Sequence, residues 1–247
     1  MPEQLNWRSV ALTETGLVRK INEDALYASD KKAHWAVADG MGGHHAGDLA
    51  SQLVVEKLDL LPQGEPLSQR VDRLEDSLIT ANQELVSMAG GDDKVIGTTV
   101  AGLMFDSRRY LVYWCGDSRV YLLRNGSLSQ ETVDHTLVQE LLEQGRINPV
   151  DVEHHPERNV ITRAVGATTN LYVDMDLRPL QAGDLFLICS DGLDKEIGEN
   201  ELTQLLNMKG QRLEHLADRL MSTCLDRTAK DNITLILISV EVTDSIE

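Results

Sequence analysis

Four aspartates that adjoin apolar strand patterns constrain this chain more than any other feature of its sequence. They are Asp39 after the apolar stretch 35–38, Asp117 between the patterns 110–115 and 120–124, Asp191 after 185–190, and Asp231 just before 233–240. Charges in such places lie at the rim of a sheet. Gathering them without counter-charge costs on the order of several kcal/mol per buried ion. Either these carboxylates lie dispersed on the surface, or a cation joins them.

The donor types indicate which cation that would be. The motifs supply oxygen ligands without paired His or Cys at ligand spacing, which favours Mg²⁺ or Mn²⁺ over Zn²⁺. Each motif alone is also compatible with an ordinary turn, because Asp followed by Gly is common in turns. The loop 40–43 has neither the GxGxxG spacing nor the GK[ST] ending of nucleotide-binding loops, so nucleotide binding is disfavoured.

Composition narrows the class of protein. The chain has 247 residues with 42% hydrophobic content, enough for a substantial core, and its only candidate linker, 62–66, is short, so we expect one domain spanning 1–247. A net charge of −17 disfavours binding to nucleic acid and anionic membranes. No membrane span or leader pattern is seen, which favours a cytoplasmic protein. Cys115, Cys189 and Cys224 lie far apart, so we expect reduced, buried thiols.

Periodicity predicts helices in pairs between groups of strands. Helices are expected at 71–88 with Ser68 as the cap, and at 46–61, 137–143, 199–206 and 211–228. Strands are expected at 34–38, 98–105, 110–115, 120–124, 172–177, 185–189 and 233–242. This order favours antiparallel sheets covered by helical layers over a doubly wound parallel sheet.

Six motifs, taken in order, resemble the metal-dependent, type 2C-like family of protein serine/threonine phosphatases, and most of all its compact bacterial members. The motifs are 16–19 with 22–24, 39–44, 97–99, 116–119, 190–193 and 231–234. The resemblance spans nearly all of the chain. It implies an α+β fold, namely a four-layer α-β-β-α sandwich with two central antiparallel sheets flanked by helix pairs, plus a flap at about 136–158.

The resemblance also implies how metals would be held. Asp39 would bridge two Mn²⁺ or Mg²⁺ ions. The Gly40 carbonyl would bind one ion, and Asp191 and Asp231 the other. Glu23 would act through metal-bound water.

Further roles follow from the same resemblance. Arg19 matches the family's phosphate-binding arginine, and it would act in catalysis with Asp39 and Asp191. Asp117 together with Asp191 would hold a third, weaker metal. Asp24 and Asn232 would orient the ligands.

The implied reaction is hydrolysis of phosphoserine or phosphothreonine by a hydroxide that bridges the two metals. The implied partners are a cognate serine/threonine kinase and its substrates, and the protein would act as a monomer. The flap would bias the choice of substrate. One departure is Met41, where many eukaryotic relatives have a histidine that is a candidate general acid. His44 and His45 lie nearby, but a histidine in such a turn more often caps or packs.

Two rival interpretations are also compatible with the sequence. One is a binding module that kept the fold and lost catalysis, against which the retention of Asp39, Asp191 and Asp231 argues. The other is a structural cation-binding protein. Arg19 discriminates against the second, because a structural cation site has no need of a phosphate clamp.

Overall fold

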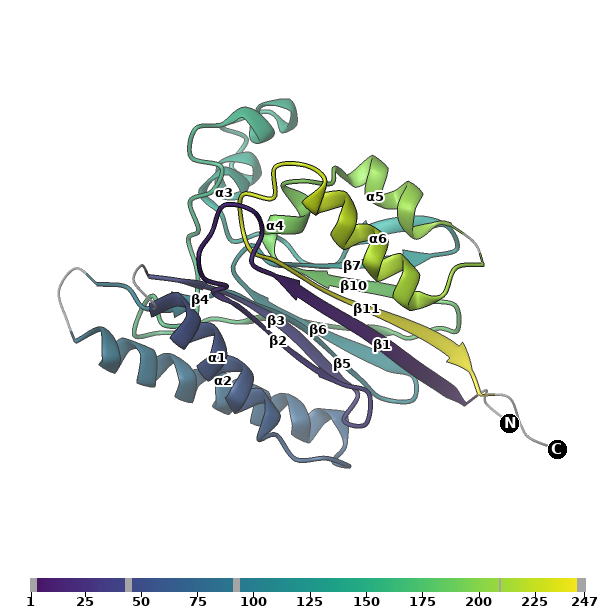
Figure 1. Ribbon diagram of the computed structural model, residues 1–247. Coiled ribbons are helices and arrows are strands. Elements are labelled where there is room, and N and C mark those ends of the chain that lie inside the picture. The colour runs from purple at the N-terminus through teal and green to yellow at the C-terminus, as the bar shows by residue number, and fades with distance from the viewer. Residues whose placement is uncertain (1–3, 43–45, 91–93, 209, 244–247) are drawn as a thin grey trace.

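The computed structural model describes residues 4–42, 46–90, 94–208 and 210–243. Two antiparallel sheets lie face to face, and helices cover the outer face of each (Figure 1). The expected α-β-β-α sandwich of an α+β protein is therefore confirmed.

One sheet has the strand order β1-β11-β10-β7-β8. Its strands are β1 (Leu5–Glu14), β7 (Arg119–Arg124), β8 (Ser127–Gln130), β10 (Leu185–Cys189) and β11 (Ile233–Val242). The helices on its side of the molecule are α4 (Asp191–Asp194), α5 (Glu199–Leu206) and α6 (Leu213–Leu225).

The other sheet has the order β2-β3-β5-β6-β9, and β4 pairs with β3 outside that path. Its strands are β2 (Asp24–Ser29), β3 (His34–Met41), β4 (Gly97–Thr98), β5 (Val100–Phe105), β6 (Arg109–Cys115) and β9 (Asp174–Pro179). It is covered by α1 (Ala46–Asp59) and α2 (Leu67–Ala89). A separate lobe carries α3 (Leu137–Glu143) and the 3₁₀ helix η1 (Pro149–His154) within the expected flap range (Figure 1).

Three apolar clusters fill the spaces between the four layers, and β3 shows how its sequence serves two of them. Trp35 and Val37 enter the cluster between the sheets, whereas Ala36 and Ala38 face the cluster under α1 and α2. Alternate residues of a strand point to opposite faces, and small alanines allow the helices to approach closely. A strand that is buried on both faces places its polar residues where few waters reach.

Some expected element ends are shifted: the strand expected at 172–177 is Asp174–Pro179, and the helix expected at 211–228 is Leu213–Leu225. Two further expectations are wrong. We expected a strand to stop at residue 38 and leave Asp39 in a turn, but β3 continues to Met41 because Gly40 and Met41 pair with β4. Asp39 therefore lies inside a strand. Ser68 is not the cap of α2, since the helix begins at Leu67 and its N-cap is Pro66, without a side-chain cap.

Asn82 is a buried polar residue on α2 that ties this helix to a loop beside β4. Its Oδ1 accepts a hydrogen bond from Gly166 N at 2.7 Å, and its Nδ2 donates to the Thr168 carbonyl at 2.9 Å. Val165, next to this loop, pairs with Thr98 of β4. The helical layer and the strand beside Asp39 are thus joined through one side chain.

We expect Asn82→Leu to lower the unfolding free energy by about 1–3 kcal/mol, because leucine has a similarly branched shape but leaves the amide and carbonyl of the loop unpaired. Urea denaturation measures this loss. The matched control is Gln83→Leu at the adjacent exposed position, which should change stability little. Equal stabilities of the two variants would contradict the expectation.

Candidate active site

Two aspartates face one another across neighbouring strands where the two sheets come together. Asp24 of β2 pairs in register with Asp39 of β3. The Asp24 carboxylate reaches across to the other sheet, where its Oδ2 accepts hydrogen bonds from Ser190 Oγ at 2.8 Å and Thr234 Oγ1 at 2.7 Å. Burial raises the pKa of Asp24 to about 6 although both hydroxyls stabilise the charged form.

Asp39 is fixed by the threonines of the 97–99 motif. Its amide donates to Thr99 Oγ1 at 3.0 Å, and its carbonyl accepts from Thr98 Oγ1 at 2.9 Å and from Thr99 N at 2.8 Å. Removal from water, followed by the charges of Asp24, Asp191 and Asp117, holds the pKa of Asp39 well above its usual range. The backbone of Asp39 is therefore satisfied, while its carboxylate faces other carboxylates.

Asp117 joins the same cluster through Ser118. Thr99 Oγ1 lies 2.7 Å from Ser118 Oγ, which links the turn after β6 to the support of Asp39. Burial and the charge of Asp191 raise the pKa of Asp117 to about 7. This turn therefore adds one more carboxylate that is difficult to ionise in the protein alone.

Asp191 and Asp231 come together because Gly192 has no side chain. A Cβ at Gly192 would lie 1.9 Å from the Asn232 carbonyl oxygen, so only glycine allows the start of α4 to approach the segment before β11 this closely. Burial raises the pKa of Asp191. Partial burial opposes ionisation of Asp231, yet the neighbouring Lys195 holds its pKa below the usual range.

Arg19 is brought to this cluster by a second close approach of backbones. Gly16 has φ of +78°, and a Cβ there would lie 2.2 Å from the Asp231 carbonyl oxygen. The adjoining segment delivers Arg19, whose Nη2 lies 2.8 Å from Asp231 Oδ1, with about half of its side chain exposed. The expected phosphate-binding arginine thus stands at the site, paired with an expected metal ligand.

Glu23 and Gly40 also meet. Glu23 Oε1 and the Gly40 carbonyl oxygen lie 2.6 and 2.8 Å from the point where a Cβ of Gly47 would stand. Asn232 supports this arrangement, since its Oδ1 accepts from Glu23 N at 2.9 Å and its amide donates to the carbonyls of Thr15 and Ile21.

The structure therefore brings together all nine side chains or carbonyls expected at the site. Gly43, His44 and His45 lie outside the described residues.

The donor set fits divalent cations. Three carboxylate oxygens, the Oδ1 atoms of Asp24, Asp117 and Asp191, are buried without a hydrogen-bond partner. Buried carboxylate oxygens without a hydrogen-bond partner are costly, and a hard cation would stabilise them. Within the described ranges, no three His, Cys, Asp or Glu side chains converge closely enough to hold a metal ion as they stand. Lys195 and Arg19 supply positive charge at Asp191 and Asp231 instead.

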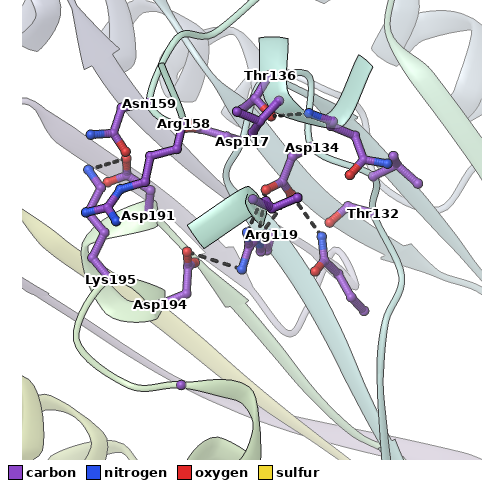
Figure 2. Close-up of a pocket in the computed structure, with 16 residues that line it drawn as sticks. Asp117, Arg119, Thr132, Asp134, Thr136, Arg158, Asn159, Asp191, Asp194 and Lys195 are labelled. Carbon is purple, nitrogen blue, oxygen red and sulfur yellow. Dashed lines mark hydrogen bonds and ion pairs between the residues drawn. The ribbon is translucent and has the colours of Figure 1, made fainter. Parts of the chain in front are cut away.

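A cavity of about 650 Å³ opens beside the cluster, between α4 and the flap lobe (Figure 2). Asp117 and Asp191 line it together with Lys195, Asp134 and Asp194, which the sequence did not indicate, and with Arg119 of the 116–119 motif. Arg119 is held by Asp134 at 2.6 Å and by Asp194 at 3.2 Å, so one guanidinium neutralises two acids of the wall. Asp134 and Asp194 carried no sequence signal, because their pairing exists only in the folded chain.

His135 has a structural position beside Asp117. Its Nδ1 accepts a hydrogen bond from Gly116 N at 3.1 Å, and its Nε2 lies 3.0 Å from Asp174 Oδ2. Burial lowers the pKa of His135, which is consistent with a neutral ring that accepts at Nδ1. The ring thus supports the residue that precedes Asp117.

Comparison with known proteins decides the family. A family model described as protein phosphatase 2C matches residues 3–170, more than half of the chain. The serine/threonine phosphatase stp of Listeria monocytogenes is 35% identical over 240 residues, covering 94% of this chain and 95% of the relative. This chain belongs to the protein phosphatase 2C family.

Other members of the family extend the likeness. The serine/threonine protein phosphatase PstP of Mycobacterium tuberculosis is 35% identical over 235 residues; the match covers 94% of this chain but 45% of PstP, so this chain spans about half the length of that relative. PppA, a regulatory component of T6SS in Pseudomonas aeruginosa, superposes with a TM-score of 0.87 at 37% identity, covering 95% of this chain and 98% of PppA. The catalytic domain of PstP in complex with two manganese ions superposes with a TM-score of 0.83 at 33% identity, covering 96% of this chain and 99% of that domain.

We expect the unfolding free energy of the metal-free protein to fall as the pH rises from about 5 to about 8. The pKa of Asp24 is about 6 in the folded chain against an ordinary 3.8, so the folded state binds this proton more tightly. Stability gained in that way is lost as the pH rises through the folded pKa. Asp24→Asn keeps a hydrogen-bond acceptor and cannot ionise, so its loss should be smaller by about 1 kcal/mol. Urea denaturation in EDTA at both pH values measures the difference, and equal losses would contradict it.

Proposed function

We propose that this chain is a metal-dependent protein serine/threonine phosphatase that hydrolyses phosphoserine and phosphothreonine. The observation that carries the proposal is the meeting of hard-to-ionise carboxylates from both sheets, three of whose oxygens have no hydrogen-bond partner, with Arg19 at their rim. Membership of the protein phosphatase 2C family supports the reaction class. The relative solved with two manganese ions supports a pair of divalent cations as cofactor.

In this proposal, the chain's own groups hold two Mn²⁺ or Mg²⁺ ions. Asp39 would serve both ions, because the charges of Asp24, Asp191, Asp117 and Asp231 all act on its carboxylate. The remaining ligands would be the Gly40 carbonyl, Asp191, Asp231 and, through water, Glu23. A third, weaker ion would use Asp117 with Asp191. When bound, the cations supply a nucleophile for attack on phosphorus at neutral pH and neutralise charge on the phosphoryl oxygens.

Arg19 would bind and orient the phosphoryl group. Its guanidinium offers several N–H groups in a planar fork that matches phosphate oxygens. The ion pair with Asp231 is made by Nη2. Half of the side chain is exposed, so a substrate can reach it. A site that served only to stabilise the fold would not need such an arginine at its mouth.

The hydrogen-bonded residues around the ligands would position them. Asn232 holds the backbone of Glu23, and Ser190 and Thr234 hold Asp24. Residues that hydrogen-bond to metal ligands commonly orient those ligands in this way. Asp24 and Asn232 are thus proposed as positioning residues.

The cysteines take no part in this reaction. Cys115, Cys189 and Cys224 are buried and unpaired, as expected from their spacing. Burial raises the pKa of each thiol, to about 12 for Cys115 and Cys224. A nucleophilic cysteine needs an ionised, accessible sulfur.

We further propose that residues 1–247 act as one catalytic domain, as a monomer, on proteins phosphorylated by a partner serine/threonine kinase. The flap lobe forms one side of the cavity that continues from the acidic cluster, which supports a part in substrate choice. Among the described helices, none combines the length and the apolar character needed to cross a membrane.

The first test is metal-dependent turnover. With an aryl phosphate as substrate, we expect activity in roughly millimolar Mn²⁺ or Mg²⁺ and its loss in EDTA, because such sites keep several waters and bind loosely. Phosphoserine and phosphothreonine peptides should be hydrolysed far faster than phosphotyrosine peptides. Full activity after exhaustive chelation would exclude the metal mechanism, and a preference for phosphotyrosine would exclude the proposed substrate class.

The second test separates Asp39 from Asp117. Asp39→Asn should impair both principal ions and lower kcat by at least about 100-fold, because it removes a shared anionic ligand. Asp117→Asn should leave those two ions bound and have a milder effect. Calorimetry with Mn²⁺ measures occupancy alongside kcat, and two undisturbed ions in Asp39→Asn would refute its bridging role.

A further inference from the structure

Lys195 lies directly after the short helix α4 that Asp191 begins. Its backbone N–H donates to the Asp191 carbonyl at 3.0 Å, so the single helical turn places the two side chains on the same face. The Lys195 ammonium then forms an ion pair with Asp191 Oδ2 and lies 3.1 Å from Asp231 Oδ2 (Figure 2 shows Lys195 beside Asp191).

The ammonium joins two acids that come from distant parts of the chain. Asp191 follows β10, whereas Asp231 precedes β11. Both are proposed ligands of one divalent ion, and Lys195 already bridges them with a single positive charge. Although burial disfavours the ammonium, Asp191 and then Asp231 raise the pKa of Lys195, so it is charged at neutral pH.

A divalent cation and this ammonium cannot share the same two oxygens. Mg²⁺ binds carboxylate oxygens at about 2.0–2.1 Å and needs a nearly ideal octahedron of oxygens around it. An ammonium donates hydrogen bonds to those lone pairs and carries a charge that repels the metal. A metal can still approach Asp191 through its unpartnered Oδ1, but both oxygens of Asp231 are already paired, Oδ2 with Lys195 and Oδ1 with Arg19. A metal that takes Asp231 Oδ2 therefore competes with the lysine for it.

The surroundings give Lys195 somewhere to go. About one third of its side chain is exposed, and it lines the cavity of about 650 Å³ that opens toward the flap. Its flexible four-carbon stem allows the ammonium to swing into this space. Arg119 already neutralises Asp134 and Asp194 in the cavity wall, so Lys195 is not needed there.

We propose that Lys195 is a resident counter-ion that competes with the divalent cation for Asp191 and Asp231, and so sets the metal affinity of the site. This inference rests on the proposed function, because it takes those two carboxylates as metal ligands. Lys195 lowers the repulsion between them in the metal-free chain. The same ion pairs weaken metal binding, since they are broken when the cation enters.

Calorimetric titration of Mn²⁺ into the whole chain tests the proposal. Lys195→Met keeps the apolar stem and removes the charge. We expect this variant to bind Mn²⁺ about tenfold more tightly than the unaltered protein, because Mn²⁺ no longer has to break a partly buried ion pair. Lys195→Arg keeps a cation and should bind no more tightly than the unaltered protein. Lys230→Met removes the same charge from an exposed position next to Asp231 and controls for the general effect of net charge.

Thermal unfolding supplies a readout that a purely structural lysine would not give. Without metal, Lys195→Met should unfold at a lower temperature than the unaltered chain, because Asp191 and Asp231 lose their counter-ion. As Mn²⁺ is added, its unfolding temperature should rise more steeply, since stabilisation by a ligand grows with its affinity. A merely structural lysine would give a deficit that stays constant with metal.

The outcomes separate the two proposals. Tighter binding in Lys195→Met, but not in Lys195→Arg or Lys230→Met, supports the competitor. Equal or weaker binding in Lys195→Met, with metal still bound and aryl phosphate still hydrolysed, overturns it and leaves the phosphatase proposal standing. Absence of Mn²⁺ binding in every form, the unaltered chain included, overturns the proposed function and this inference with it.

Discussion

Repulsion among carboxylates that are held together at the meeting of two sheets is the constraint on which the rest of this structure depends. Asp24 and Asp39 face one another across β2 and β3, and both feel the charge of Asp191 from the other sheet. Such a cluster opposes folding unless its charges are neutralised or hydrogen-bonded. The three apolar clusters between the layers supply the stabilisation that offsets this cost.

Hydroxyl and amide groups around the cluster fix its geometry without neutralising it. Thr99 holds the Asp39 backbone and also contacts Ser118, next to Asp117. Thr234 contacts Asp24 and, on its other side, lies 2.7 Å from Thr13 Oγ1 of β1. Neutral donors can orient a carboxylate, but they leave its charge in place. In the proposed enzyme, a pair of cations would complete this arrangement of oxygens.

The buried central strands were predictable from the sequence, whereas three of the four edge strands were missed and the fourth, β9, was predicted two residues too early. The ranges of β10 and β11 were predicted to the residue, because continuous apolar runs mark strands buried on both faces. The strands that were missed, β1, β2 and β8, all lie at sheet edges, where partly exposed faces weaken the apolar pattern. The acidic motifs could be recognised in the sequence. The ion pairs of Lys195 and Arg19 with Asp231 were not, because they join segments that meet only in the folded chain.

Asp231 links the side chains of Arg19 and Lys195, because both pair with its carboxylate. Arg19 takes its Oδ1 and Lys195 its Oδ2, so neither carboxylate oxygen is available while both pairs stand. A divalent ion that binds Asp231 would compete with both pairs at once. In the proposed enzyme, loading of the metal would then also release the Arg19 guanidinium toward the phosphoryl group. Metal binding and readiness to bind substrate would be linked through one carboxylate, by the reciprocity that governs any pair of coupled equilibria.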